Sequence, residues 1–275
     1  MPDQPTVLEF QDVSLRFGET PALDHVSFQL LAGETRVVYG VAGSGKTTLL
    51  KVALGLVKPD SGRVHVFGQD VTDFRESDWF DLRARMGILF QEGGLFDSMT
   101  VADNVGYPLM NQRLLRHPDA SHAVERVRET LRFVELEQTL DKFPSELSGG
   151  MRRRVGIARA VVTEPPMVLY DSPTAGLDPI TANTIINLIL KERDLRNAAS
   201  IMVTHRFQDG HLMANFRYNP KNEQIEHMAW DGMADTPGKP VSTEFFVMNE
   251  GRLVFMGTQE ELRLSQDPYI KKFAK

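Results

Sequence analysis

The sequence feature that most constrains the fold of this 275-residue chain is the segment Gly40–Thr47, GVAGSGKT, which matches the whole pattern GxxxxGK[ST]. A short apolar segment, Arg36–Tyr39, precedes it, and Thr47–Val57 predicts a helix that ends near Pro59. Glycines at this spacing let consecutive backbone N–H groups point into one concavity, which the start of the helix extends. The order strand, glycine-rich loop, helix therefore predicts an α/β fold built around a phosphate-binding loop.

The residues of this loop predict how a bound nucleotide is held. The Lys46 ammonium can reach the β- and γ-phosphates, and the Thr47 hydroxyl can ligate Mg²⁺. Further along the chain, Met167–Asp171 is an apolar segment ending in an acid, as expected of a strand whose Asp171 carboxylate holds the same ion. The residues expected to cradle the phosphates are Gly40, Gly43, Ser44, Gly45, Lys46, Thr47 and Thr48.

A second anion-binding helix start is predicted at Leu147–Met151, LSGGM. Ser148 is a good helix N-cap, Gly149 and Gly150 leave the backbone N–H groups accessible, and the helix that follows is basic (Arg152, Arg153, Arg154). One nucleotide rarely needs two such sites on a single chain. The pattern therefore predicts a nucleotide shared between two chains.

With these two motifs in this order, the chain resembles the ATP-binding cassette (ABC) family over roughly Leu8–Leu262. In that family the LSGGQ signature closes over the nucleotide held by the other subunit's phosphate loop. The resemblance implies ATP with Mg²⁺, a homodimer or a pair with a related ATPase subunit, and membrane-embedded permease subunits. It also assigns four further residues. Phe17 matches the adenine-stacking aromatic and Gln91 the Q-loop glutamine near the metal, while Asp178 matches the D-loop aspartate and His205 the switch histidine.

The same resemblance implies an α/β fold with a RecA-like core, an antiparallel β subdomain and an α-helical subdomain. We expect an ATPase domain over residues 5–265, with the helical subdomain at about 77–160, a loop or hairpin excursion at 211–243 and a tail at 266–275. From Ser77 to about Asp141 the pattern is mainly helical, and one amphipathic helix buries Val124, Val127, Leu131 and Val134. Strands are expected at Val7–Phe10, Val13–Phe17, Val26–Leu30, Gly62–Gly68 and Ser200–Thr204, a hairpin at Glu244–Met248 and Arg252–Met256, and helices at Thr181–Arg196 and about Gln259–Leu264.

A finer resemblance rests on Met151, where most ABC members have Gln, and on the segments Phe90–Met99 and Asp103–Leu109. These look like the Mla/Mce-associated branch, whose ATPases drive lipid trafficking between bacterial membranes. That branch implies an Mce-domain lipid-binding partner and, at the C-terminal excursion, a small regulatory subunit or a solvated loop. The alternatives are an ABC ATPase for another substrate and an ATP-binding regulator without a transport role.

Ser172 departs from the family, which carries a Glu directly after the Asp at position 171. A serine hydroxyl is a poor base at neutral pH, and a positioned general base contributes about 10²–10⁴-fold in rate. Three interpretations remain open: a block that traps ATP, slow hydrolysis supported by His205, or pairing with a different ATPase subunit that carries the base. Binding of ATP and Mg²⁺ through Lys46 and Asp171 is expected under all three.

Composition excludes several other classes. Lys plus Arg is 31 and Asp plus Glu is 37, for a net charge of −6, which is unlike the basic domains that coat nucleic acid, so we expect no nucleic-acid partner. Cysteine is absent, which excludes disulfides and thiolate chemistry. No signal peptide and no apolar run of about 18–20 residues is evident, so we expect a cytoplasmic chain held at the inner face of the inner membrane by its permease partners.

Overall fold

The core of the molecule is a six-stranded sheet in the order β12-β11-β3-β8-β7-β6, as seen in a computed structural model that describes residues 4–111, 120–228 and 242–274. All neighbouring strands are parallel except β12 and β11, because β12 returns antiparallel to β11 through a tight hairpin. The strands are β3 (Thr35–Tyr39), β6 (Met86–Leu89), β7 (Met167–Asp171), β8 (Ala199–Thr204), β11 (Thr243–Asn249) and β12 (Arg252–Gly257).

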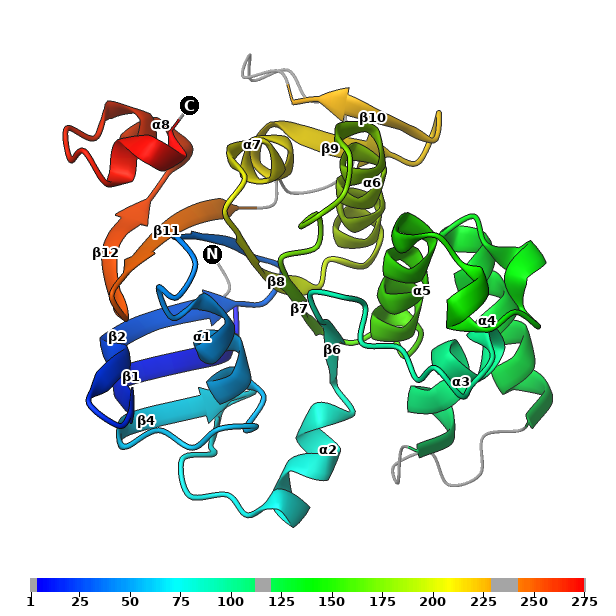
Figure 1. Ribbon diagram of the computed structural model, residues 1–275, viewed down its shortest axis with the longest axis horizontal. Helices are drawn as coiled ribbons and strands as arrows, with labels where there is room; N and C mark the ends of the chain where they lie inside the picture. The colour runs from blue at the N-terminus through cyan, green and yellow to red at the C-terminus, as the bar shows by residue number, and fades with distance from the viewer. Residues whose placement is uncertain (1–3, 112–119, 229–241, 275) are drawn as a thin grey trace.

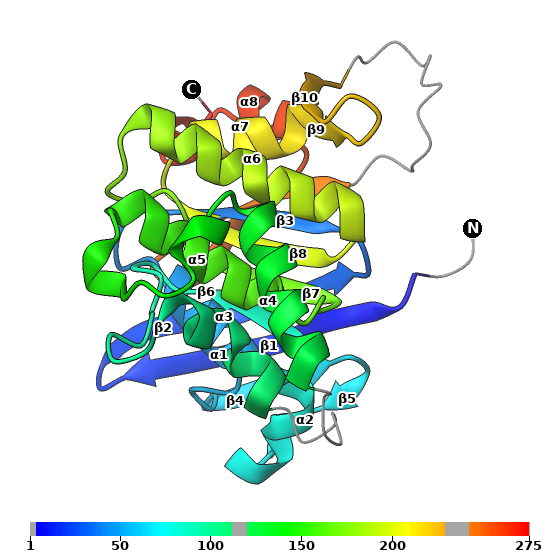
Figure 2. The same cartoon turned by 90° about the vertical axis from the view of Figure 1, so that its right-hand side faces the viewer.

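A second, four-stranded antiparallel sheet has the order β2-β1-β4-β5. Its strands are β1 (Thr6–Phe17), β2 (Thr20–Leu31), β4 (Ser61–Val66) and β5 (Gln69–Asp70). The two segments Val7–Phe10 and Val13–Phe17, expected as separate strands, form the single strand β1, in which the register shifts between Phe10 and Val13. Figure 2 shows α6 (Pro179–Arg196), the parallel sheet and this antiparallel sheet as successive layers.

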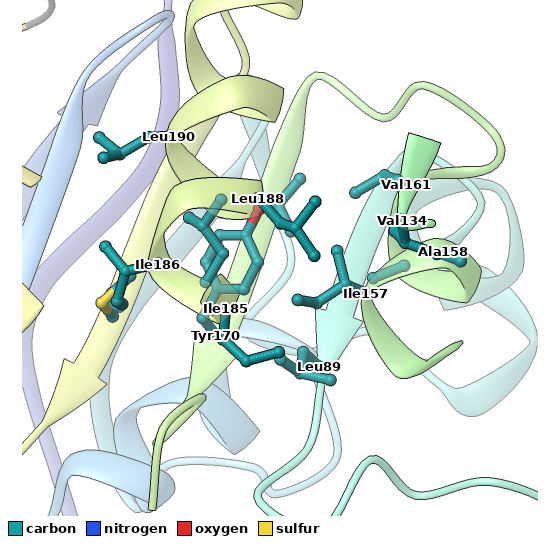
Figure 3. Close-up of a cluster of buried hydrophobic side chains, with 14 of the residues drawn as sticks. Leu89, Val134, Ile157, Ala158, Val161, Tyr170, Ile185, Ile186, Leu188 and Leu190 are labelled. Atoms are coloured by element: carbon teal, nitrogen blue, oxygen red, sulfur yellow. The ribbon is translucent and has the colours of Figure 1, made fainter. Parts of the chain in front are cut away.

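Successive side chains of the parallel strands point to opposite faces of the sheet and pack in two separate hydrophobic cores. Met167 and Leu169 of β7 pack with α1 (Lys46–Ala53) and the antiparallel sheet. Val168 and Tyr170 of the same strand pack on the other face, against α5 (Gly149–Val161) and α6. Figure 3 shows this second core, where Tyr170 lies among Leu89, Ile157, Ile185 and Leu188. Helices α1 and α5 are therefore held on opposite faces of one sheet.

The remaining helices lie mostly on the α5 side of the sheet (Figure 1). Helices α3 and α4 pack against α5, and the hairpin of β9 and β10 packs on α6. Over the described residues, no helix has both the length and the apolar composition required to cross a membrane. The bounds are α2 (Phe80–Arg83), α3 (Val101–Asn111), α4 (Ala120–Phe133), α7 (Phe207–Asn215), α8 (Gln259–Leu264), β9 (Phe216–Asn219) and β10 (Gln224–His227).

The predicted α/β class, with a parallel core sheet and an antiparallel subdomain, is confirmed. The prediction of mainly helix from Ser77 to Asp141 is wrong in part, because Met86–Leu89 forms the edge strand β6 beside β7. The predicted end of the first helix near Pro59 is also wrong. Helix α1 ends at Ala53, where the Leu56 N–H donates to the Lys51 carbonyl and closes a C-terminal turn.

Two further expectations about the helices need correction. Val124, expected on the buried face of its helix, is 58% exposed, whereas Val127, Leu131 and Val134 are buried as expected. Helix α7, which directly follows His205, was not expected from the sequence. The predicted excursion contains the short β9–β10 hairpin, and its residues 229–241 lie outside the described part of the chain. The subdomain boundaries stay a prediction.

Candidate nucleotide-binding site

The phosphate-binding loop joins the buried strand β3 to helix α1. At its end, Gly45 has φ 105°, a left-handed conformation that glycine adopts without strain. A Cβ at Gly45 would lie 2.3 Å from the Ala22 carbonyl oxygen of β2, and one at Gly40 would lie 2.7 Å from the Met248 carbonyl oxygen of β11. At Gly40 and Gly45 the loop therefore contacts both sheets too closely for a side chain, whereas a Cβ at Gly43 would meet no atom within 4 Å.

Lys46 lies over the centre of this loop. Its Nζ donates to the carbonyl oxygens of Gly40 (2.9 Å) and Val41 (2.8 Å) and to Ser44 Oγ (3.3 Å). Burial lowers the pKa of the Lys46 ammonium, and the nearby Asp171 carboxylate offsets part of that decrease. A cation in a ring of backbone groups, with a carboxylate close by, suits a phosphate that carries a divalent metal ion.

Four adjacent parallel strands end at the same edge of the sheet, and each leads into a predicted site residue. Strand β3 leads into the loop, β8 into His205, β7 ends at Asp171 before Ser172, and β6 is followed by Gln91. Asp171 is buried, whereas His205 and Gln91 are exposed at this edge. In open α/β sheets this carboxyl-end crevice is where ligands bind.

The donor set at this edge fits Mg²⁺. Thr47, Gln91 and Asp171 offer a hydroxyl, an amide and a carboxylate oxygen, the hard donors that this ion prefers. Over the described ranges, no three histidine, aspartate or glutamate side chains gather into a metal site of their own. An ion here would therefore rely on one acid, on neutral oxygens and on the phosphates of the nucleotide.

Ser172 adopts a left-handed backbone conformation, with φ 49°. Its N–H donates to the Val203 carbonyl of β8 (2.9 Å), and its hydroxyl donates to Asp171 Oδ1 (3.2 Å). The turn is thus fixed at the site edge, and its hydroxyl is directed at the neighbouring carboxylate. The structure places no carboxylate side chain at position 172.

Asp209 is a functional candidate that the sequence analysis missed. It is 1% exposed on α7, and its Oδ2 accepts hydrogen bonds from Thr174 Oγ1 and Thr204 Oγ1, both at 2.6 Å. Thr174 follows Ser172 by two residues, and Thr204 directly precedes His205. One buried carboxylate therefore ties together the turns that carry these two residues. The sequence offers one signal for Asp209, an acid in the first turn of α7, but this helix was not predicted, so the signal could not be recognised.

The second predicted anion site lies apart from the loop. Ser148 caps α5 by accepting a hydrogen bond from the Met151 N–H (3.3 Å), and Asp178 caps α6 by accepting from the backbone of Ile180 and Thr181. Hydrogen bonds from Thr181 lower the pKa of Asp178. Both caps line a hollow of about 550 Å³ whose lining includes no residue of the phosphate loop. The structure thus groups Ser148, Gly149 and Gly150 with Asp178.

The basic residues of α5 are engaged with the protein itself. Each of Arg152, Arg153 and Arg154 donates to a backbone carbonyl, and Arg154 also lines the signature hollow. That these arginines add to an anion site stays a prediction. Phe17, by contrast, is 57% exposed at the turn between β1 and β2. That turn leads to Ala22, which contacts Gly45, so Phe17 lies on the strand pair that borders the loop.

A scan against protein families matches residues 23–175 to the ABC transporter family. The chain is 36% identical over 74% of its length to a methionine import ATP-binding protein of Rhizobium etli. It spans about half of that relative, 55%. It is 31% identical over 99% of its length, and 74% of the relative's, to the chloroplastic protein TRIGALACTOSYLDIACYLGLYCEROL 3 of Arabidopsis thaliana.

Solved structures agree with this assignment. A dimeric ATP-binding cassette, MJ0796, bound to ADP and Pi superposes with a TM-score of 0.75 at 25% identity, covering 91% of this chain and 98% of that one. The cbiO1 protein of Clostridium perfringens, part of the complex cbiONQ, gives a TM-score of 0.74 at 26% identity and covers 94% and 91% of the two chains.

Proposed function

The chain belongs to the ABC transporter ATP-binding family, and from this membership we propose that it binds and slowly hydrolyses ATP to drive lipid transport between bacterial membranes. One observation carries the ATP part of the proposal. Strands β3, β8, β7 and β6 end side by side, and they lead into the loop, His205, Asp171 with Ser172, and Gln91. These are the groups required to bind a triphosphate, hold its metal ion and contact its terminal phosphate.

In the proposed reaction the backbone N–H groups of the loop bind the phosphate oxygens, and Lys46 neutralises charge on the β- and γ-phosphates. Thr47, Gln91 and Asp171 would hold Mg²⁺, which when bound neutralises charge on the phosphates. His205 contacts the γ-phosphate from the end of β8. Ser172 stands where a base would orient the attacking water, and its hydroxyl already donates to Asp171. Binding is therefore complete, whereas the chemical step is slow.

The proposed functional unit is a dimer arranged head to tail. Helices α1 and α5 lie on opposite faces of the parallel sheet, so the signature start at Ser148 is on the far side from the loop of its own chain. A second copy brings its Ser148 and Asp178 to the first copy's loop. The cassette MJ0796 is described as dimeric, which supports this arrangement.

A groove between α3 and α4 is the proposed docking site for a membrane-embedded permease subunit. Its volume is about 670 Å³, and its apolar lining includes Met110 and Val124, which are 66% and 58% exposed. Large exposed apolar patches mark interaction sites. The relative cbiO1 is described as part of a transporter complex, which supports a permease partner at the inner membrane.

The lipid substrate rests on the finer sequence resemblance and on one relative. The Arabidopsis protein, which is named after a galactolipid, matches 99% of this chain. An Mce-domain lipid-binding protein and a small regulatory subunit complete the proposed assembly. The second candidate is import of a polar nutrient, favoured by the higher identity, 36%, to the methionine importer over a shorter match.

Calorimetric titration of Mg-ATP into the full chain tests the ATP assignment. Lys46→Ala removes a charge-assisted contact worth about 1.5–3 kcal/mol, so we expect affinity to fall roughly 10- to 150-fold. Lys51→Ala, on the exposed side of the same helix, is the matched control and is expected to bind as the parent does. Equal affinity for the parent and Lys46→Ala would show that Lys46 does not bind the phosphates.

A second experiment separates the two substrate candidates. Lipid that co-purifies with the assembled transporter would support lipid transport, whereas turnover of ATP that methionine stimulates would support nutrient import.

A further inference from the structure

Arg153 lies on the signature helix α5 and is 6% exposed. Two nitrogens of its guanidinium donate to two backbone carbonyls of the turn that follows β7. Nη1 donates to the Ser172 carbonyl (3.3 Å), and Nη2 donates to the Ala175 carbonyl (3.1 Å). A single side chain thus connects the signature helix to both ends of the turn that contains the position of the missing base.

The same guanidinium interacts with two acids at the nucleotide edge. Burial lowers the pKa of Arg153, and Glu92 and Asp171 both offset that decrease. Glu92 directly follows Gln91, and Asp171 directly precedes Ser172. Arg153 is therefore near all three segments that meet at this edge from the α5 side, namely the segment after β6, the end of β7 and the turn 172–175.

The two neighbouring arginines have different partners. Arg152 Nη1 donates to the Leu147 carbonyl (2.7 Å), within its own helix start. Arg154 Nη1 donates to the Val134 carbonyl (3.2 Å) and lies 3.6 Å from Glu135, at the end of α4. Only the middle arginine of the three donates to the turn after Asp171, whereas Arg154 lines the signature hollow.

We propose that Arg153 is a positioning residue for ATP hydrolysis, which fixes the turn Ser172–Ala175 relative to the signature helix. The proposal rests on the proposed ATPase function. The Ser172 carbonyl also accepts from the Ala175 N–H (3.1 Å), so Arg153 closes over a turn that is already hydrogen-bonded. Because the guanidinium is rigid and planar, its two bonds set the distance and the angle between α5 and this turn together.

The two bonds of Arg153 connect α5 to the two segments of the chain that border the proposed site. Ser172 opens the turn and Ala175 precedes Gly176, Leu177 and Asp178, which line the signature hollow. A displacement of α5 therefore moves the position that faces the γ-phosphate and the segment that faces the second copy at the same time. A misplacement of about 1 Å at a reacting centre can cost 10²-fold in rate, so loss of this fork affects the chemical step.

The test compares Arg153→Lys with Arg193→Lys in the full chain, each made in the parent and in Ser172→Glu, where turnover is expected to be higher. Arg193 is 3% exposed in α6, and its guanidinium donates to the Met213 and Phe216 carbonyls, beside the start of β11 and away from the carboxyl ends of the strands. Both substitutions keep a positive charge and remove the planar fork. We expect Arg153→Lys to lower kcat by roughly 10- to 100-fold with KM for ATP unchanged, and Arg193→Lys to leave both constants at the parent's values. Hydrogen exchange at the Ser172 and Ala175 amides is expected to increase in Arg153→Lys alone.

The outcomes are distinguishable. Equal kcat for Arg153→Lys and its parent overturns the proposal, and faster exchange at the turn with unchanged kcat does so too, because it assigns Arg153 a purely structural role. An equal decrease for Arg153→Lys and Arg193→Lys also overturns it, since the effect would then follow from the loss of any buried guanidinium that bonds two carbonyls. If neither the parent nor Ser172→Glu binds or hydrolyses ATP, the proposed function fails, whatever the role of Arg153.

Discussion

At the scale of single residues, the turn after β7 determines what the site can do. Ser172 has φ 49° and is bonded through its N–H, its carbonyl and its hydroxyl, so its place is fixed by neighbours on three sides. The side chain at this position is short, and Pro173 follows it directly. Because several hydrogen bonds hold the backbone of this turn, we expect its conformation to persist when the side chain at position 172 is replaced.

Ser172→Glu should therefore restore a base without rebuilding the site. We expect turnover of ATP to rise within the roughly 10²–10⁴-fold range of a positioned general base, less any loss from crowding by the larger side chain. Steady-state phosphate release, measured beside nucleotide affinity, checks this. If the parent already turns over at about 1 s⁻¹ and the variant gains nothing, another residue supplies the base.

A second residue-scale prediction concerns Glu192, which is 1% exposed in α6 and lies 2.9 Å from Arg196. Burial raises the pKa of Glu192 to about 7, and Arg196 offsets only part of that rise. The folded state then keeps a proton that the unfolded chain releases near pH 4.5. The resulting stabilisation is present below pH 4.5 and is lost as pH rises through about 7.

Glu192→Gln keeps the shape of the protonated side chain and cannot ionise. Between pH 5 and pH 8 we expect the free energy of unfolding of the parent to fall by roughly 2–3 kcal/mol relative to this variant, because the slope of about 1.4 kcal/mol per pH unit holds only between the two pKa values and levels off above about 7. Urea titrations at several pH values measure this difference. Parallel pH curves for the two proteins would mean that Glu192 is ionised throughout.

At the scale of elements, the segment after α8 supports the phosphate loop. Tyr269 Oη accepts a hydrogen bond from the Val41 N–H (3.4 Å) and donates to the Met248 carbonyl (2.9 Å). Phe273 stacks on Tyr39, the last residue of β3, whose ring also stacks on Phe245. The C-terminal segment thus contacts both the loop and the strand that leads into it.

Tyr269→Phe removes the hydroxyl and keeps the ring. Because one hydrogen bond within the folded chain contributes about 0.5–1.5 kcal/mol, we expect the free energy of unfolding to fall by about that amount, and affinity for Mg-ATP to fall by no more than about 12-fold through displacement of the loop. Calorimetry and thermal unfolding check the two halves of this statement. An equal loss in Lys272→Ala, whose ammonium lies 5.2 Å from the Tyr269 ring, would assign the effect to the segment as a whole.

Which elements could be predicted from the sequence depended on how local their signals are. Strand β3, the loop and α1 carry complete local signals, and so does the hairpin of β11 and β12 with its turn at Asn249–Gly251. Strand β6 has four residues inside a helical stretch, and only its pairing with β7 makes it a strand. The site residues named by motif lie at strand ends or helix starts, which have local signals. Arg153 and Asp209 are candidates only because of bonds to Ser172 and Thr174, 19 and 35 residues away, and no local pattern encodes such bonds.

At the scale of the whole molecule, the site is divided between the two faces of one sheet. Helix α1, into which the loop leads, packs in the core shared with the antiparallel sheet, and Leu147 of the signature packs in the core shared with α5 and α6. The hollow that Ser148 lines includes no residue of the phosphate loop of the same chain. In the proposed dimer, association of two copies would therefore complete the site, with the nucleotide between them.

Ser148→Arg tests this association, because it places a bulky cation at the helix start that must approach the nucleotide. We expect ATP-induced dimerisation, followed by light scattering, to be lost in Ser148→Arg. Ser148→Ala is the control, since it removes the cap of α5 at a cost of about 1 kcal/mol and leaves the space free. Equal dimerisation of Ser148→Arg and the parent would contradict the shared site.

The order of strands in the core sheet has a consequence for biosynthesis. Strand β3 comes early in the chain, yet both of its neighbours, β8 and β11, come from the last third. During translation the phosphate loop therefore emerges long before the strands that support it, and pairing across such a distance is slow. Until the hairpin of β11 and β12 has left the ribosome, the nascent chain carries a complete phosphate-binding motif that has no folded site in which to bind a nucleotide.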